Sequence, residues 1–411
     1  MHIVLPTIGS AGDVIPVIGL GIALKARGHR VTVLTNPYFQ TMIERVGLEL
    51  APVGTVADFQ KGLDNPDLWH PIKGLQTIVR EAILPAMPIM YEYLATLNPS
   101  DTILAASGMS LGARLAQEKL GLRLVTVHLQ PTLFMSAYDN SEMGGVKMPD
   151  WLPIGFQSWR LKELERWIVD PLIAPTLNAF RAELGLPPAS RVFGRWMHSP
   201  QRVLGLFPDW FAAPQPDWPP NLFLSGFVDY QPEDAPLTPE IEQFLSKGEP
   251  PIVFTPGSAM QHGDRFFRAA IEASQKLSKR AILLTRFRDQ LPARLPEGFL
   301  HVEWVQLGRL LPYATALVYH GGIGTMAQAL KAGIPHLVVP FAHDQPDNAN
   351  RLKALGIAER LNPGQFTATR VVQKLDWLLS DPLVRARCAG YAEKMNFEKA
   401  LDAACRWIET V

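Results

Sequence analysis

The chain has 411 residues, of which 47 % are apolar and 19 % are charged, a balance that excludes a mainly disordered protein. Its 39 basic residues equal its 39 acidic residues, so it lacks the basic excess of a general nucleic-acid binder. Two cysteines are too few for a disulfide framework or a cysteine zinc site.

The first half of the chain repeats a pattern of strand, glycine-containing loop, helix and strand, which is typical of a parallel sheet. Residues 159–184 are predicted as a long helical region that Pro171 and Pro175 interrupt. The other elements predicted here are strands at 2–6, 30–35, 103–105 and 122–127, with helices at about 14–27 and 111–120.

A polar, proline-rich stretch at 229–251 suits a linker, and a second alternating series follows it. We therefore predict an α/β protein with two Rossmann-like, doubly wound domains, residues 1–228 and 229–411, that face each other across a cleft. Ligands of such sheets bind at the carboxyl ends of the strands, so the cleft is the expected site. The second series consists of strands at 252–255, 281–285, 317–319 and 336–340 and helices near 266–277, 325–332 and 348–355.

The strongest chemical signal is the segment 318–328, in which a strand enters the motif His-Gly-Gly-Ile-Gly-Thr and then a helix. Glycine allows close approach to a ligand, and a helix start offers free N–H groups and the positive end of the helix dipole. These features suit a phosphate group, to which His320 can donate a hydrogen bond. Taken alone, the glycines are explained equally well by a tight turn.

Two further segments give this motif a context, Trp-Val-Gln at 304–306 and Asp-Gln at 344–345. Together they resemble the donor-binding signature of family 1 glycosyltransferases, which have the GT-B fold. Residues 9–16, Gly-Ser-Ala-Gly-Asp-Val-Ile-Pro, resemble a segment of the bacterial and sterol-type members. Segments 196–200, 207–211 and 217–219 are similar to the bacterial rhamnosyltransferase branch, which includes rhamnolipid and flavonoid rhamnosyltransferases.

The resemblance implies a donor-binding role for one set of residues. Trp304 is expected to stack on the pyrimidine of the donor, and Asp344 with Gln345 to hold its sugar hydroxyls. Considered singly, Trp304 is more simply a core aromatic residue and Asp344 a helix N-cap. The donor-binding candidates are Ser258, Trp304, Val305 (through its backbone), His320, Gly322, Gly324, Thr325, Gln328, Asp344 and Gln345.

The candidate catalytic base is Asp13, which lies three residues before Pro16, where many family members carry a histidine base. Without the resemblance, a carboxylate at a helix start is more simply a partner of the helix dipole. Histidine-base members orient the histidine with an aspartate, and Ser107 occupies that place here. An aspartate base needs no such partner.

Gln328 bears on the identity of the donor, because many UDP-sugar enzymes have a glutamate there that grips both ribose hydroxyls. A neutral amide grips less strongly, and a deoxyribose has one hydroxyl fewer. We therefore hypothesise that dTDP-rhamnose is preferred to UDP-glucose. The nucleotide sugar is a co-substrate, and we predict neither a cofactor nor a metal, since no Asp-x-Asp triplet occurs.

The acceptor is expected to be a hydrophobic, hydroxylated small molecule such as a flavonoid or a hydroxyacyl lipid. Residues 133–159 hold the candidate acceptor contacts Phe134 and Trp151 among glycines and prolines, although ordinary packing beneath a long loop explains them equally well. A lipid acceptor would bring weak contact with a membrane surface. The resemblance also implies that the last helix, from about residue 397, packs on the N-terminal domain.

These expectations add up to an inverting, metal-independent hexosyltransferase. Two alternatives stay open, a nucleotide-sugar epimerase of the same architecture and a non-catalytic nucleotide-binding auxiliary protein. The N-terminal sequence lacks the basic n-region of a signal peptide, and its longest apolar stretch is shorter than the about 20 residues of a membrane span. We expect a cytoplasmic protein without nucleic-acid partners; its oligomeric state is not predicted.

Overall fold

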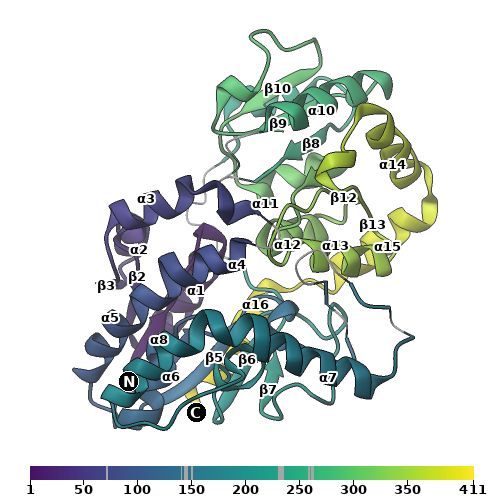
Figure 1. Cartoon of the computed structure of the whole chain (residues 1–411). Helices are drawn as coiled ribbons and strands as arrows, with labels where there is room; N and C mark the ends of the chain where they lie inside the picture. Colours follow the sequence, from purple (N-terminus) through teal and green to yellow (C-terminus); the bar gives the residue numbers. More distant parts are fainter. Residues whose placement is uncertain are drawn as a thin grey trace. The chain divides into compact units, whose positions relative to one another are not determined.

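The computed structural model of the chain describes residues 1–70, 73–139, 141–142, 147–149, 151–229, 236–257, 260 and 263–411. The chain forms two compact units (Figure 1). Unit 1 comprises Met1–Pro232 and Asn396–Val411, and unit 2 comprises Glu233–Met395. The C-terminal helix therefore belongs to the same unit as the N-terminus.

Unit 1 is built on a seven-stranded parallel sheet with the order β3-β2-β1-β4-β5-β6-β7. All five residues of β1 are buried, as expected for a parallel strand covered on both faces. The strands are β1 (His2–Pro6), β2 (Arg30–Thr35), β3 (Glu49–Pro52), β4 (Thr102–Ser107), β5 (Arg123–His128), β6 (Arg202–Gly205) and β7 (Leu222–Leu224).

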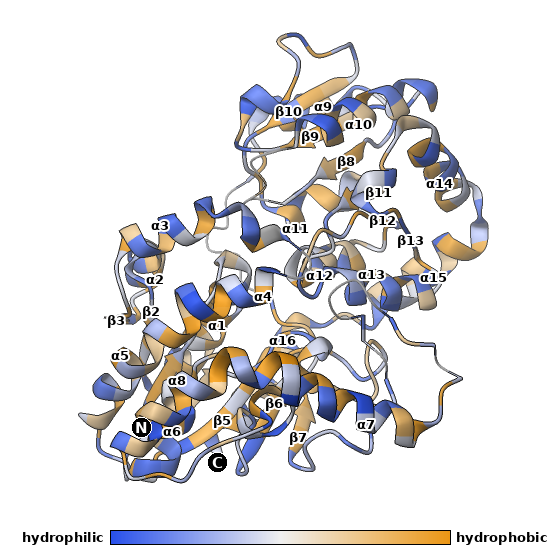
Figure 2. Ribbon diagram, in the orientation of Figure 1, coloured by the Kyte–Doolittle hydropathy of each residue, from blue (hydrophilic) through white to orange (hydrophobic). Residues whose placement is uncertain are grey.

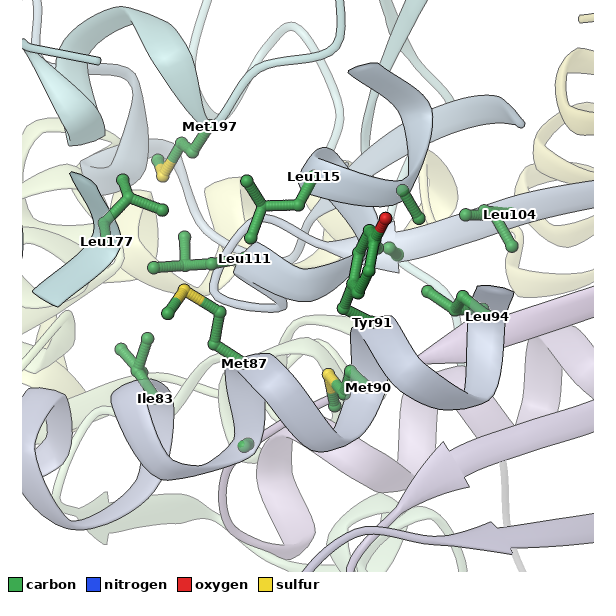
Figure 3. Packing of buried hydrophobic residues seen from close by; sticks show 14 of the residues in the cluster. Ile83, Met87, Met90, Tyr91, Leu94, Leu104, Leu111, Leu115, Leu177 and Met197 are labelled. Atoms are coloured by element: carbon green, nitrogen blue, oxygen red, sulfur yellow. The ribbon is translucent and has the colours of Figure 1, made fainter. Parts of the chain in front are cut away.

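Alternate residues of each strand point to opposite faces of this sheet. Because both faces are apolar, helices cover both of them. Ile3 and Leu5 pack in a cluster with residues of α1 and α16, and Val4 packs in a second cluster with α5, α6 and α8. In that second cluster Met87, Leu111, Leu177 and Met197 point toward one another (Figure 3). The helices are α1 (Ala11–Ala26), α2 (Gln40–Arg45), α3 (Val56–Asp64), α4 (Lys73–Ile78), α5 (Leu84–Ala95), α6 (Leu111–Leu120), α7 (Ile154–Leu164), α8 (Asp170–Glu183) and α16 (Phe397–Glu409).

The predicted interruption of the 159–184 helix by prolines is wrong. α7 continues through a π-helical turn, Glu165–Val169, directly into α8. Pro171 follows this π-helical turn directly and Pro175 lies inside α8, so the winding of the helix changes beside the prolines without a break. Asp170 at the same place accepts hydrogen bonds from the backbone N–H groups of Arg191 and Val192.

Unit 2 is built on a six-stranded parallel sheet with the order β10-β9-β8-β11-β12-β13. Its strands are largely apolar, whereas the covering helices α10 and α14 carry many hydrophilic residues (Figure 2). The elements are β8 (Ile252–Thr255), α10 (Asp264–Lys276), β9 (Ala281–Leu284), β10 (Phe299–Val302), α11 (Leu307–Leu310), β11 (Ala316–Tyr319), α12 (Ile323–Ala332), β12 (His336–Val338), α13 (Gln345–Ala354), β13 (Ala358–Arg360), α14 (Ala368–Ser380) and α15 (Pro382–Glu393).

The predicted linker at 229–251 is wrong in part, since it contains the helix α9 (Pro239–Ser246). Thr238 caps this helix by accepting a hydrogen bond from the Ile241 backbone, and Pro239 occupies the first helical position. The predicted fold class, two doubly wound α/β sheets, is confirmed. Within the described ranges, no helix has the length and apolar character to cross a membrane.

Candidate active site

Asp13 lies in the first turn of α1, beyond the carboxyl end of β1. Its Oδ2 accepts hydrogen bonds from the Ser10 backbone N–H, at 2.8 Å, and from the Ser10 hydroxyl, at 3.2 Å. Gly9 has a φ of 134°, and a Cβ at Gly9 would overlap the Asp13 carboxylate. The glycine and the serine of the segment 9–16 therefore set the position of this carboxylate.

The Asp13 side chain is half-buried. Burial raises the pKa of this carboxyl group, and the two hydrogen bonds from Ser10 oppose that rise. A carboxylate with a raised pKa holds a proton more strongly, which makes it a better general base.

A pocket opens beside Asp13 at the carboxyl ends of β1, β4 and β5. Ser107, at the end of β4, lines the same pocket, and its Oγ accepts a hydrogen bond from the Met109 backbone at 3.3 Å. The pocket leaves room for a hydroxyl-sized group beside the carboxylate, with apolar side chains around it. Its polar lining residues are Thr7, Asp13, Ser107 and Gln130, and its apolar ones are Ile8, Val17, Met109, Val127, Leu129 and Leu133.

The two predicted acceptor contacts lie in different surroundings. Phe134 is only 3 % exposed, and its ring stacks with those of Trp218 and His198, at centroid distances of 4.6 and 5.6 Å. Trp151 is 80 % exposed. It is Leu133, the neighbour of Phe134, that lines the Asp13 pocket. Residues 140, 143–146 and 150 of the predicted acceptor segment lie outside the described residues.

In unit 2, His320 follows β11 directly and its ring lies between two glycines. A Cβ at Gly322 would come within 2.5 Å of the His320 Nε2, and a Cβ at Gly257 within 3.2 Å of the Nδ1. Burial lowers the pKa of His320 to about 4, so the imidazole is neutral near neutral pH. Its Nδ1 is buried without a hydrogen-bond partner among the described residues.

The helix α12 begins just after His320, with Gly322 as its N-cap residue and no side-chain cap. Around Gly324, in the first turn, a Cβ would meet open space. The first N–H groups of a helix have no intrahelical partner, so this end can bind an anion. Thr325 is half-buried in the same turn, and Gln328, one turn further on, is 7 % exposed.

Trp304 and Val305 lie between β10 and α11. Trp304 is 46 % exposed, so it is not a core aromatic residue. A large exposed ring can stack on a flat ligand. Val305 is half-buried beside it. Ser258, the remaining diphosphate candidate, lies outside the described residues.

Asp344 is the N-cap residue of α13, and Gln345 is the first residue of that helix. The Gln345 side chain is 4 % exposed, and its Oε1 accepts hydrogen bonds from the backbone N–H groups of Phe341 and Ala342. The Asp344 Oδ2 accepts a hydrogen bond of 2.7 Å from the Nδ2 of Asn348. Sequence reasoning missed Asn348, although its place one helical turn after Asp344 was a usable signal. Over the described ranges, no cluster of three or more His, Cys, Asp or Glu could hold a metal ion.

Comparisons with known proteins identify the class of enzyme. The model of the glycosyltransferase family 28 N-terminal domain matches residues 3–134, and that of the erythromycin biosynthesis protein CIII-like C-terminal domain matches residues 277–400. The chain is 27 % identical to the O-mycaminosyltylonolide 6-deoxyallosyltransferase of Streptomyces fradiae, with 100 % of the chain and 98 % of that enzyme covered. The chain is a nucleotide-sugar-dependent glycosyltransferase of the GT-B type.

Solved structures agree with this glycosyltransferase in fold. The structure of the kitacinnamycin glycotransferase has a TM-score of 0.76 at 21 % identity, covering 100 % of the chain and 98 % of that protein. The spinosyn rhamnosyltransferase SpnG, complexed with thymidine diphosphate, has a TM-score of 0.67 at 19 % identity, covering 98 % of the chain and 99 % of that protein. These structures confirm the predicted GT-B fold, and the family models and the Streptomyces fradiae relative confirm the predicted hexosyltransferase activity.

Proposed function

We propose that this glycosyltransferase moves L-rhamnose from dTDP-rhamnose to a hydroxyl of an apolar secondary metabolite, with inversion at the anomeric carbon. The observation that carries the proposal is the half-buried Asp13 carboxylate in a largely apolar pocket. Burial has raised its pKa, which suits it to accept a proton from a hydroxyl and not only to pair with the helix dipole.

In the proposed reaction, the acceptor hydroxyl hydrogen-bonds to the Asp13 carboxylate. Its oxygen attacks the anomeric carbon while its proton passes to Asp13, and the bond between that carbon and the diphosphate oxygen breaks. The diphosphate leaves from the opposite face of the sugar, so the anomeric configuration inverts. Since the described residues that line the Asp13 pocket include no second carboxylate, the proposed base works alone, held by Ser10.

The donor contacts are proposed for unit 2. The diphosphate lies at the start of α12, against His320, Gly322, Gly324 and Thr325, where N–H groups stabilise the charge that develops on the leaving group. Neutral His320 donates from one nitrogen to a phosphate oxygen. Ser258 joins this set, Trp304 stacks on the base whose edge the Val305 backbone binds, and Asp344 with the Gln345 amide nitrogen holds the sugar.

A thymidine donor is supported by Gln328 and by the thymidine diphosphate complex of the structural relative SpnG. A buried neutral amide at position 328 supplies less attraction for a pair of ribose hydroxyls than a glutamate would. UDP-glucose is the competing donor. The choice of rhamnose as the sugar rests on the resemblance of segments 196–200, 207–211 and 217–219 to rhamnosyltransferases.

An apolar acceptor is supported by the six apolar residues in the lining of the Asp13 pocket. The names of the relatives refer to tylonolide, kitacinnamycin and spinosyn compounds, so a secondary metabolite is the acceptor class we propose. Flavonoids and hydroxyacyl lipids are the specific acceptors to test. The buried Phe134 would influence the acceptor indirectly, through its sequence neighbour Leu133 in the pocket lining. The exposed Trp151 would contact the acceptor directly. Weak membrane-surface contact follows only for a lipid acceptor, and a cytoplasmic location remains part of the proposal.

The deciding experiment incubates the enzyme with dTDP-rhamnose or UDP-glucose, each with and without a flavonol or a hydroxyacyl lipid. Acceptor-dependent release of thymidine diphosphate, with an inverted glycoside as product, is the expected result. Preference for UDP-glucose contradicts the donor assignment. Conversion of the sugar without any acceptor would indicate an epimerase, and nucleotide binding without turnover on any acceptor would indicate an auxiliary protein; the glycosyltransferase relatives favour neither.

A further inference from the structure

Asn348 is fully buried on α13 and connects two parts of the donor site of unit 2. Its Nδ2 donates to the Gly321 carbonyl oxygen at 2.9 Å and to the Asp344 Oδ2 at 2.7 Å. Gly321 belongs to the loop of His320, the candidate diphosphate ligand, and Asp344 is the candidate sugar ligand. One amide group thus joins the two loops that follow β11 and β12.

The surroundings of the amide fix its orientation. Both neighbours of the Nδ2 are oxygen acceptors, so the opposite rotamer would place the Oδ1 against two oxygens. The Oδ1 itself is buried and has no hydrogen-bond partner among the described residues. Burial of an unsatisfied acceptor costs free energy, so the residue is not explained by stability alone.

The Gly321 loop packs closely on the start of the same helix. Gly321 has a φ of 98°, and a Cβ there would come within 2.8 Å of Val338 and 3.2 Å of the Gln345 carbonyl oxygen. A small displacement of α13 would therefore move the loop of His320 as well. The Asn348 amide bonds to that loop and to Asp344 at the start of α13.

We infer that Asn348 is a positioning residue, which holds the Asp344 carboxylate in register with the diphosphate loop so that sugar and phosphates of one donor are bound together. The inference rests on the proposed donor site. Serine at this position is too short to reach both acceptors, and aspartate keeps the shape but faces them with oxygen.

The test measures, by calorimetry, the dissociation constants of dTDP-rhamnose and of dTDP for the wild type, Asn348→Ser and Asn348→Asp. We expect the advantage of the nucleotide sugar over dTDP to fall by about tenfold in Asn348→Ser, because the Asp344 carboxylate loses its hydrogen bond from the Asn348 amide. The affinity for dTDP should change by less than about threefold. Asn348→Asp should lose more of this advantage. The aspartate variant buries a charge and can unfold for that reason; in that case the serine variant still tests the inference.

The control is Asn350→Ser, two residues further along α13, where the Oδ1 accepts a hydrogen bond from Arg360. It should leave both dissociation constants unchanged. The double variant Asp344→Ala/Asn348→Ser should bind dTDP-rhamnose as well as Asp344→Ala alone does, since Asn348 acts through Asp344.

Equal weakening of both ligands, or additive losses in the double variant, would mean that Asn348 merely stabilises the fold, and would overturn the inference. An unchanged ratio of the dissociation constants of dTDP-rhamnose and dTDP in Asn348→Ser would also overturn the inference. A wild type that binds neither dTDP nor UDP, nor their sugars, would instead refute the proposed function itself, and this is seen before any variant is made.

Discussion

The two units contain the same local structure, a parallel strand that turns through glycines into a helix, but they place different groups at the start of that helix. At the start of α1 the protein places its own carboxylate, since Asp13 lies in the first turn and accepts hydrogen bonds from the backbone N–H and the hydroxyl of Ser10. At the start of α12 the N-cap residue is Gly322, and no side chain caps the helix. An occupied helix end presents a carboxylate, whereas an uncapped end is suited to an anionic ligand.

The largest effect is expected at the occupied helix end. Asn in place of Asp13 keeps the shape and can still accept the Ser10 hydrogen bond, but it cannot take up a proton. We expect Asp13→Asn to lower kcat by about 10³-fold with little change in the KM for the donor, because general-base catalysis contributes about 10²–10⁴-fold. Steady-state kinetics with a saturating acceptor measure both constants.

Asp58→Asn is the matched control, because Asp58 has the same place in α3 and accepts hydrogen bonds from Thr55 at 3.2 and 2.6 Å. It should lose a similar small amount of stability, about 1 kcal/mol, and no activity. An equal loss of kcat in the two variants would show that Asp13 serves only to cap its helix.

The second effect concerns the histidine beside the uncapped helix end. His320 has a pKa of about 4 in the folded chain against 6.5 as the usual value, so the unfolded chain binds more protons between these two pH values. Its contribution to the free energy of unfolding is present above pH 6.5 and is lost as the pH falls toward 4, by about 3 kcal/mol in total. Denaturant unfolding at several pH values measures the slope.

In His320→Phe this slope should become shallower, because the group that takes up the proton on unfolding is gone. His336→Phe is a useful comparison, since burial lowers the pKa of His336 to about 3 and this residue lies within β12. Both variants should reduce the acid sensitivity, but only His320→Phe should weaken dTDP binding. A pH profile unaffected by His320→Phe contradicts the neutral, buried imidazole.

The third effect tests the exposed ring of Trp304 at the proposed donor site. Trp304→Ala should weaken dTDP binding by about tenfold, because stacking on an aromatic ring contributes about 1–3 kcal/mol for each base. Trp377, on α14, is exposed to a similar extent, at 41 % against 46 %, and serves as the control. If Trp377→Ala weakens dTDP as much as Trp304→Ala, the stacking role is wrong. Calorimetric titration with dTDP decides between them.

The comparison also indicates what the sequence could predict. Strands β1 and β2 were predicted with their observed bounds because both are uninterrupted apolar or β-branched runs. The sequence did not predict β3, β6, β7, β10 and β13, which have only three or four residues each; β13, which reads Ala-Glu-Arg, has no apolar run at all. Such short segments become strands only because a neighbouring strand pairs with them.

At the candidate site, the sequence predicted those motifs that lie within a single loop. The place of His320 before the start of α12 follows from consecutive residues, and so does that of Asp13 in the first turn of α1. Contacts between loops could not be predicted, such as Asn348 with Gly321, or Leu133 with the Asp13 pocket. These depend on how neighbouring strands place their following loops, which local periodicity does not encode.

Gly324→Ala, which has the smallest expected change in stability, tests the uncapped helix end most sharply, because stability and dTDP binding should change in opposite directions. In Gly324→Ala the added methyl meets open space in the folded chain, so the helix should gain about 0.5–1 kcal/mol of stability. The same methyl lies where a diphosphate would approach the N–H groups, and the affinity for dTDP should fall by about tenfold. Gly390→Ala in α15, which also meets open space, should stabilise the chain without affecting dTDP. Thermal unfolding and calorimetric titration of the two variants separate these outcomes, and a Gly324→Ala enzyme that binds dTDP normally would place the diphosphate away from α12.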